Sequence, residues 1–133
     1  LVSHGELAAA LLTTASEIVG PFDRCEVLAV SRHQRTREIR ESLRGAIQRA
    51  DTGPGVLVLA DMFGGTAANV ALELVGEVNI EVVTGMSLPM LLKASADRST
   101  ATELASFARI IKFYGQRNVM VASEVLKERE QDA

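Results

Sequence analysis

The stretch VLVLADMFGGTAANVA, residues 56–71, decides the fold of this chain. It opens with five consecutive apolar residues at 56–60, and an unbroken run of this length is typical of a strand that helices cover on both faces. A glycine-rich turn that begins with Asp61 follows at 61–65, and a helix pattern continues from there to about residue 76. The stretch therefore predicts a buried strand that passes through a tight turn directly into a helix.

The same alternation of strand and helix continues on both sides of this stretch. Further apolar runs of strand length stand at 1–2, 26–30 and 80–85. Helical periodicity occupies 5–19, 35–50 and 88–96. Thr100 and Glu103 have the spacing of a capping box, which predicts a helix over about 101–114 that Gly115 ends.

Repeated strand–helix units are the pattern of an α/β fold with an open, mainly parallel sheet flanked by helices. We expect a last short strand over 118–122, before a charged tail at 127–132 that frays. One domain over 1–133 is expected, because the sequence has no internal repeat, linker or low-complexity segment. The chain begins at Leu1 in what reads as the end of a strand, so we expect this first strand to be truncated at its N-terminus.

Composition argues against several classes of function. With 47% hydrophobic and 23% charged residues, the chain is that of an ordinary globular protein. The net charge of -3, the lack of Trp and the single Tyr argue against a nucleic-acid binder. Cys25 is the only cysteine, and we expect a buried thiol, no internal disulfide and no metal site. No apolar run approaches the roughly 20 residues that cross a bilayer and no signal peptide is visible, so we expect a cytoplasmic protein.

The candidate chemistry follows the strand ends, because an open parallel sheet binds ligands beyond the carboxyl ends of its strands. His4 follows the first strand and Asp61 follows the third. A histidine at a strand end fits a turn residue, a metal ligand, a general base or a covalent carrier. A neutral imidazole is a good nucleophile near pH 7, and a carboxylate on its second nitrogen fixes the tautomer and stabilises the developing charge. If the first and third strands are neighbours, Asp61 can serve His4 in this way.

Gly64, Gly65 and Thr66 lie where a phosphoryl group on His4 would need hydrogen-bond donors. The N–H groups of a glycine-rich turn at a helix N-terminus suit an anion, and the helix dipole assists them. The two glycines also fit a simple tight turn, and Thr66 fits either a helix N-cap or a phosphate ligand. Ser87 stands before Leu-Pro and fits either an N-cap or a hydroxyl that lines the phosphate site.

Three motifs, SHG at 3–5, LVLADMFGGTAANVA at 57–71 and TGMSLPMLL at 84–92, together resemble the enzyme IIA domain of the mannose-type sugar phosphotransferase system. The resemblance covers nearly the whole chain. It implies a sheet of order 2-1-3-4 with an antiparallel C-terminal edge strand, which some members exchange within a dimer, so we expect a homodimer. It also implies that His4 is the phosphorylated residue and that Asp61 orients it.

The resemblance implies a phosphoryl carrier that accepts the group from phospho-HPr and passes it to a IIB component. Such a carrier is an enzyme only as a phosphotransfer intermediate, and it needs no small-molecule cofactor. Two alternatives stay open: the phosphoryl-donor subunit of a dihydroxyacetone kinase, and a regulatory module whose phosphorylation state signals without sugar transport.

The loop after the second strand departs from the family, which usually has an acidic, glycine-containing turn there. It reads SRHQRTREIR at 31–40 and is either a solvated helix start or a modified docking surface that includes Arg32 and Arg35. Met62 and Phe63 are candidates for an apolar docking patch, and Phe63 also fits a core position.

Overall fold

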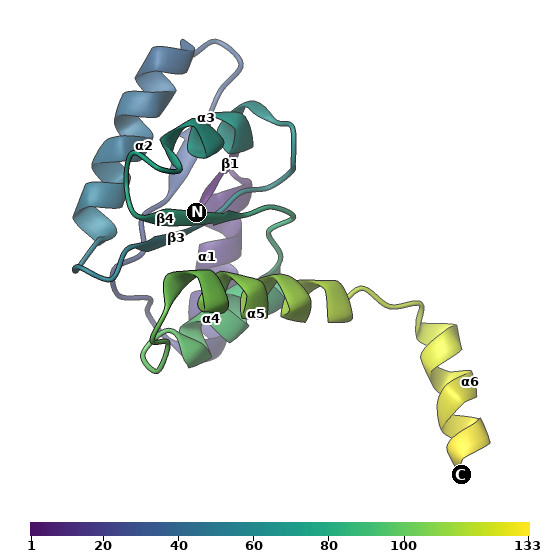
Figure 1. Cartoon of the computed structure of the whole chain (residues 1–133). Coiled ribbons are helices and arrows are strands. Elements are labelled where there is room, and N and C mark those ends of the chain that lie inside the picture. Colours follow the sequence, from purple (N-terminus) through teal and green to yellow (C-terminus); the bar gives the residue numbers. More distant parts are fainter.

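Four short strands lie between two layers of helices in the computed structural model, which describes residues 1–133 (Figure 1). The strands are β1 (Val2–His4), β2 (Leu28–Val30), β3 (Val56–Leu59) and β4 (Ile80–Val83). The helices are α1 (Leu7–Val19), α2 (Thr36–Ala50), α3 (Thr66–Leu74), α4 (Leu88–Asp97), α5 (Leu104–Arg117) and α6 (Ala122–Asp132). The predicted α/β class is therefore confirmed, with a helix after each strand. None of the helices combines the length and the apolar character needed to cross a bilayer.

The strands form two parallel pairs. β1 pairs with β2 in the register Val2–Leu28, and β3 pairs with β4 in the register Val56–Ile80. An isolated parallel bridge between Val2 and Ala60 connects the two pairs. This bridge brings the carboxyl end of β1 next to the segment that follows β3, and it positions the candidate site. The complete strand order 2-1-3-4 stays a prediction.

Side chains alternate along the strands and fill two separate cores. Val58 belongs to a core shared with α2 and α3, whereas Leu59 belongs to a second core shared with α1, α4 and α5, against which Leu57 also packs. Each face of β3 thus has its own helical layer, as Figure 1 shows. This arrangement explains why the run at 56–60 is apolar throughout instead of alternating with polar residues.

The prediction of a strand over 118–122 is wrong for the single chain. Residues 118–121 form no strand, and α6 continues from Ala122 and stands away from the other helices (Figure 1). A strand needs a partner edge for its backbone groups, and this segment instead bonds locally: the Val119 N–H donates to the Gln116 carbonyl at 3.2 Å. The tail at 127–132, expected to fray, is helical because it is rich in the strong helix formers Lys, Glu and Arg.

Helix α5 begins and ends later than predicted. Its N-cap is Glu103, and the Thr100 hydroxyl donates to the Asp97 carbonyl, so the predicted capping box does not form. Gly115 lies inside the helix, where an added Cβ would come within 2.7 Å of the Met90 side chain. Gly115 therefore allows close packing of α5 on α4 and does not end the helix.

Candidate functional site

His4 and Asp61 lie in direct contact at the edge of the sheet where the strands end. The His4 ring nitrogen Nδ1 is 2.7 Å from Asp61 Oδ2, and the His4 backbone N–H donates to the same oxygen at 2.9 Å. The second carboxylate oxygen, Oδ1, accepts the backbone N–H of Met62 at 2.9 Å. Three groups therefore fix the carboxylate, and the carboxylate fixes one nitrogen of the imidazole.

The two side chains differ in their access to solvent. Asp61 exposes 9% of its side chain, whereas His4 exposes 48%. Burial alone would raise the pKa of Asp61, but hydrogen bonds from the His4 backbone and ring and from Met62, together with the charge on His4 when protonated, hold that pKa below its ordinary value. An ionised Asp61 accepts a hydrogen bond from Nδ1–H, so the neutral His4 ring carries its lone pair on Nε2. The tautomer that this geometry selects has its nucleophilic nitrogen free.

The turn that leads into α3 packs against the imidazole. A Cβ added to Gly65 would lie 3.0 Å from His4 Cε1 and 3.1 Å from the Met62 Cγ atom. Gly65 is the N-cap of α3 and Thr66 is its first helical residue, so the interpretation of Thr66 as an N-cap is wrong. Gly64 has a φ of +79°, a left-handed conformation that favours glycine. The first-turn N–H groups of α3 thus begin immediately beside His4.

Ser3, the first residue of the SHG motif, is a site residue to which the sequence assigned no role. It is fully buried, and its hydroxyl oxygen accepts the Ala8 N–H at 2.8 Å while the hydroxyl donates to the His4 carbonyl at 3.1 Å. These bonds tie the end of β1 to the first turn of α1 and hold the backbone of His4 in place. The only signal in the sequence is a serine at a strand position that otherwise calls for an apolar side chain.

Ser87 lies between β4, the strand that pairs with β3, and the start of α4. Its side chain accepts the Met90 N–H at 3.4 Å, which makes it the N-cap of α4. The N-cap interpretation is thus confirmed, and a second role of the hydroxyl toward phosphate stays a prediction.

Met62 and Phe63 form an exposed apolar pair in the turn that follows Asp61. Met62 is 54% exposed and Phe63 is 75% exposed, so Phe63 is not a core residue. Both follow Asp61 directly in the chain, and Met62 also packs near Gly65. An apolar surface of this kind beside a reactive group suits a protein that docks over it.

The five arginines of 31–44 fall into two groups, three with an ion pair and two without, and Arg37 pairs with Glu41 of its own helix at 2.9 Å. Arg40 donates to Glu73 and Glu77, and Arg44 donates to Glu77, so these two arginines tie α2 to α3 and the turn after it. Arg32 and Arg35 are exposed, take part in no ion pair and lie in the loop between β2 and α2. The predicted docking residues Arg32 and Arg35 are therefore free of intramolecular ion pairs.

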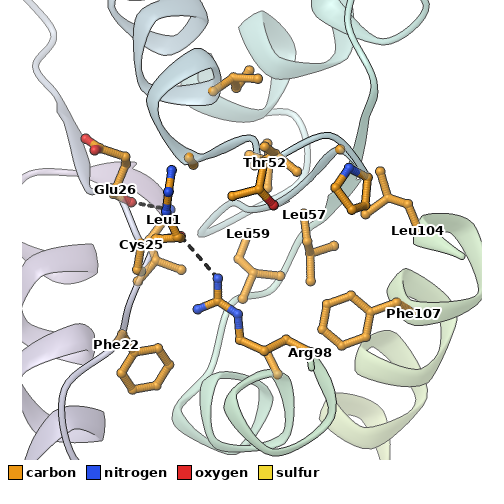
Figure 2. Close-up of a pocket in the computed structure, with 18 of the residues that line it drawn as sticks. Leu1, Phe22, Cys25, Glu26, Thr52, Leu57, Leu59, Arg98, Leu104 and Phe107 are labelled. Atoms are coloured by element: carbon orange, nitrogen blue, oxygen red, sulfur yellow. Dashed lines mark hydrogen bonds between the residues drawn. The ribbon is translucent and has the colours of Figure 1, made fainter. Parts of the chain in front are cut away.

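A separate cavity of about 600 Å³ opens at the amino ends of the strands (Figure 2). Leu57 and Phe107 give it an apolar wall, and Arg98 crosses it to donate to the Asp23 carbonyl. The Cys25 thiol also lines it, and burial raises the pKa of that thiol. None of the predicted site residues borders this cavity, so the candidate chemistry lies at the other edge of the sheet.

The chain is similar in sequence to a family of known proteins. Residues 1–111 match the family model EIIA-man, described as "PTS system fructose IIA component". The chain is 30% identical over 110 residues to the mannose-specific EIIAB component of Escherichia coli K12, covering 80% of this chain and 34% of that protein. The chain thus spans about a third of the length of that relative. It is 29% identical over 115 residues to the sorbose-specific EIIA component of Lacticaseibacillus casei, covering 84% of this chain and 83% of the relative.

Solved structures share the fold. The mannose/sorbose-specific IIA subunit of the phosphotransferase system from Enterococcus faecalis superimposes with a TM-score of 0.81 at 28% sequence identity, covering 90% of this chain and 89% of that one. The protein associated with the fucose utilization operon of Streptococcus pneumoniae, a PTS IIA protein, gives a TM-score of 0.79 at 25% identity, covering 94% and 92% of the two chains.

Proposed function

The chain belongs to the EIIA-man family of phosphotransferase-system IIA components, and on that premise we propose that it is a phosphoryl carrier whose acceptor atom is Nε2 of His4. One observation carries the proposal: the 2.7 Å contact between Nδ1 and Asp61 leaves Nε2 as the unpaired nitrogen of a half-exposed ring. A carboxylate that holds the tautomer in this way also stabilises the imidazolium-like charge that develops during attack.

The transfer follows directly from this geometry. The lone pair on Nε2 attacks the phosphorus of a phosphorylated donor protein, and a new N–P bond forms. The bond between phosphorus and its carrier atom on the donor breaks, and its electron pair stays with the donor. The proton on Nδ1 remains in the hydrogen bond to Asp61, so no proton has to leave the ring. In the second transfer a nucleophilic atom of the acceptor protein attacks the phosphorus. The N–P bond breaks, and its electron pair returns to Nε2.

The turn before α3 is proposed to hold the phosphoryl oxygens. Gly65 brings the backbone close to His4, and α3 begins at the next residue, so the electropositive N-terminal end of this helix lies near the imidazole. The hydroxyl of Thr66 at the first helical position is exposed and available as a further donor. Ser87, which follows β4, is proposed as a further contact to the phosphoryl oxygens. Its oxygen already accepts the Met90 N–H as the N-cap of α4.

The partners in this proposal are the phosphocarrier HPr as donor and a IIB component as acceptor. The exposed apolar pair Met62 and Phe63 supplies a docking surface at the reactive group, which either protein can cover in turn. A cytoplasmic location belongs to the same proposal, since the donor in such a system draws its phosphoryl group from phosphoenolpyruvate.

A homodimer is part of the proposal as well, and with it the sheet order 2-1-3-4 and an antiparallel edge strand. β4 pairs only with β3, and a groove of about 580 Å³ borders its other side, lined by Val82, Lys112 and Val119 among others. The apolar segment 119–121 is largely exposed, with Val119 at 84%. The open edge of β4 and an unpaired apolar segment support strand addition from a second copy.

Incubation with phosphoenolpyruvate, enzyme I and HPr tests the function directly. Intact mass measurement should show one acid-labile phosphoryl group on the wild-type chain and none on His4→Ala. His33→Ala is the matched control, because His33 is the only other histidine and is exposed in the loop after β2. No mass gain in the wild type, or a gain that survives in His4→Ala, would overturn the proposal.

A further inference from the structure

The loop between β2 and α2 lies beside the proposed phosphoryl acceptor. In the β1–β2 ladder His4 is the partner of Val30, and the Gly5 N–H donates to the Val30 carbonyl at 3.2 Å. The chain continues from Val30 into the loop, so Arg32 and Arg35 follow at the same edge of the sheet. Neighbouring strands are about 4.8 Å apart, so the loop leaves the sheet one strand away from His4.

The charge of this loop is not balanced within the molecule. The chain as a whole has a net charge of -3, yet Arg32 and Arg35 are exposed and belong to no ion pair. Two nearby carboxylates already have other hydrogen-bond partners. Glu38 accepts the Arg35 backbone N–H at 3.3 Å, and Asp61 accepts the hydrogen bond from His4. Glu6 is the remaining carboxylate in sequence next to the site. Arg32 and Arg35 are thus two unbalanced cations in the loop that leaves the sheet next to His4, and we refer to them as the cationic rim.

We propose that this cationic rim selects the phosphorylated form of the donor protein and releases the donor once the phosphoryl group has moved to His4. The proposal rests on the proposed function. A protein-bound phosphoryl group carries about 1.5 to 2 negative charges near pH 7, which two guanidinium groups match. Before transfer the rim attracts a donor that bears this charge. After transfer the charge sits on His4, next to the rim, and cancels that attraction.

The same reasoning separates the two partners. The acceptor meets a site whose rim is already neutralised by phospho-His4, so its docking depends on the apolar pair Met62 and Phe63 and little on Arg32 and Arg35. Charges at the rim of an interface act chiefly on association rates and on their salt dependence. The rim therefore governs loading of His4 from the donor, and it does so most strongly at low ionic strength.

The test compares Arg32→Glu/Arg35→Glu with the wild type, using phospho-HPr as the donor. At low salt the second-order rate of His4 phosphorylation should fall about tenfold or more, within the range of electrostatic steering. In 1 M salt, where the Debye length is about 3 Å, the two proteins should differ by less than about twofold. Unphosphorylated HPr should inhibit the wild type only weakly. Arg32→Gln/Arg35→Gln should show a smaller loss of rate at low salt.

Two controls keep the outcomes distinct. Lys127→Glu/Arg129→Glu makes the same charge change on the exposed helix α6 and should leave the rate unchanged. Phosphoramidate, a small donor without a protein surface, reports whether His4 is reactive in each variant. The proposal of a cationic rim is overturned if Arg32→Glu/Arg35→Glu is slowed no more than the α6 control. It is also overturned if the loss of rate persists in 1 M salt. Failure of wild-type His4 to accept phosphate from either donor overturns the proposed function itself.

Discussion

Gly65→Ala tests whether packing against the turn holds the imidazole in its reactive position. The added Cβ would lie 3.0 Å from His4 Cε1 and 3.1 Å from Met62 Cγ, whereas ordinary contacts are 3.4 Å or longer. The methionine side chain can move aside, but the imidazole is held by the 2.7 Å bond to Asp61. The ring must therefore shift by several tenths of an ångström, at the expense of that bond.

The size of the effect follows from the strength of the bond. A hydrogen bond to a charged group contributes about 1.5–3 kcal/mol, and about 1.4 kcal/mol corresponds to a tenfold change in rate. Loss of most of this bond should slow phosphorylation of His4 by about 10- to 100-fold. Alanine adopts the φ of -76° at Gly65 without backbone strain, but it is a poorer N-cap than glycine and it weakens a bond that stabilises the folded chain. The free energy of unfolding should therefore fall, by no more than about 1.5–3 kcal/mol.

Rapid-quench kinetics with phospho-HPr and thermal unfolding of the same samples provide the two measurements. Gly45→Ala is the matched control, since Gly45 lies within α2 and meets only the flexible end of Arg49. Alanine is favoured over glycine inside a helix by about 0.5–1 kcal/mol, so Gly45→Ala should be slightly more stable than the wild type and should keep the wild-type rate. Wild-type kinetics in Gly65→Ala would refute the claim that contact with this turn positions His4.

Three further perturbations test other parts of the site. Asp61→Asn should slow phosphorylation by about 10- to 100-fold, the usual cost of losing such a supporting group, while the fold measured by circular dichroism stays the same; an unchanged rate would remove Asp61 from the mechanism. Ser3→Ala leaves the buried Ala8 N–H without its partner and should lower the free energy of unfolding by about 1–3 kcal/mol in urea titrations; an unchanged midpoint would show that the hydroxyl does not support the turn. Because the pKa of Asp61 is lowered in the folded chain, its contribution to stability is complete above the ordinary aspartate value of about 3.9 and is lost as the pH falls through the folded pKa. Asp61→Asn should therefore lose less stability than the wild type between pH 5 and about 2, and parallel losses would contradict this assignment.

The main features of the site could be predicted from the sequence because they depend on strand ends. An unbroken apolar run at 56–60 indicates a strand covered on both faces, and polar residues after parallel strands meet at one edge. These rules place His4 and Asp61 at strand ends, and the resemblance to the IIA family, which implies that the first and third strands are neighbours, pairs them. Their contact through both the ring and the backbone N–H adds a detail that spacing alone does not provide.

Other features depend on contacts that a single sequence does not reveal. Ser3 acts through Ala8 and the His4 carbonyl, and its role emerges only once β1 and α1 are packed together. Gly115 has the residue type of a helix end, but its proximity to Met90 makes it a packing position instead. Residues 118–121 have the apolar character of a strand, and whether they pair depends on an edge that the single chain does not offer them.

The central claim is that Nε2 of His4 bears the phosphoryl group while Nδ1 stays bound to Asp61. Nitrogen-15 and phosphorus-31 NMR of the phosphorylated protein, with histidine selectively labelled, tests it most directly. The account predicts phosphorus coupling to Nε2 of His4 alone and a protonated Nδ1 in a hydrogen bond. Coupling to Nδ1, or to any other residue, would contradict it.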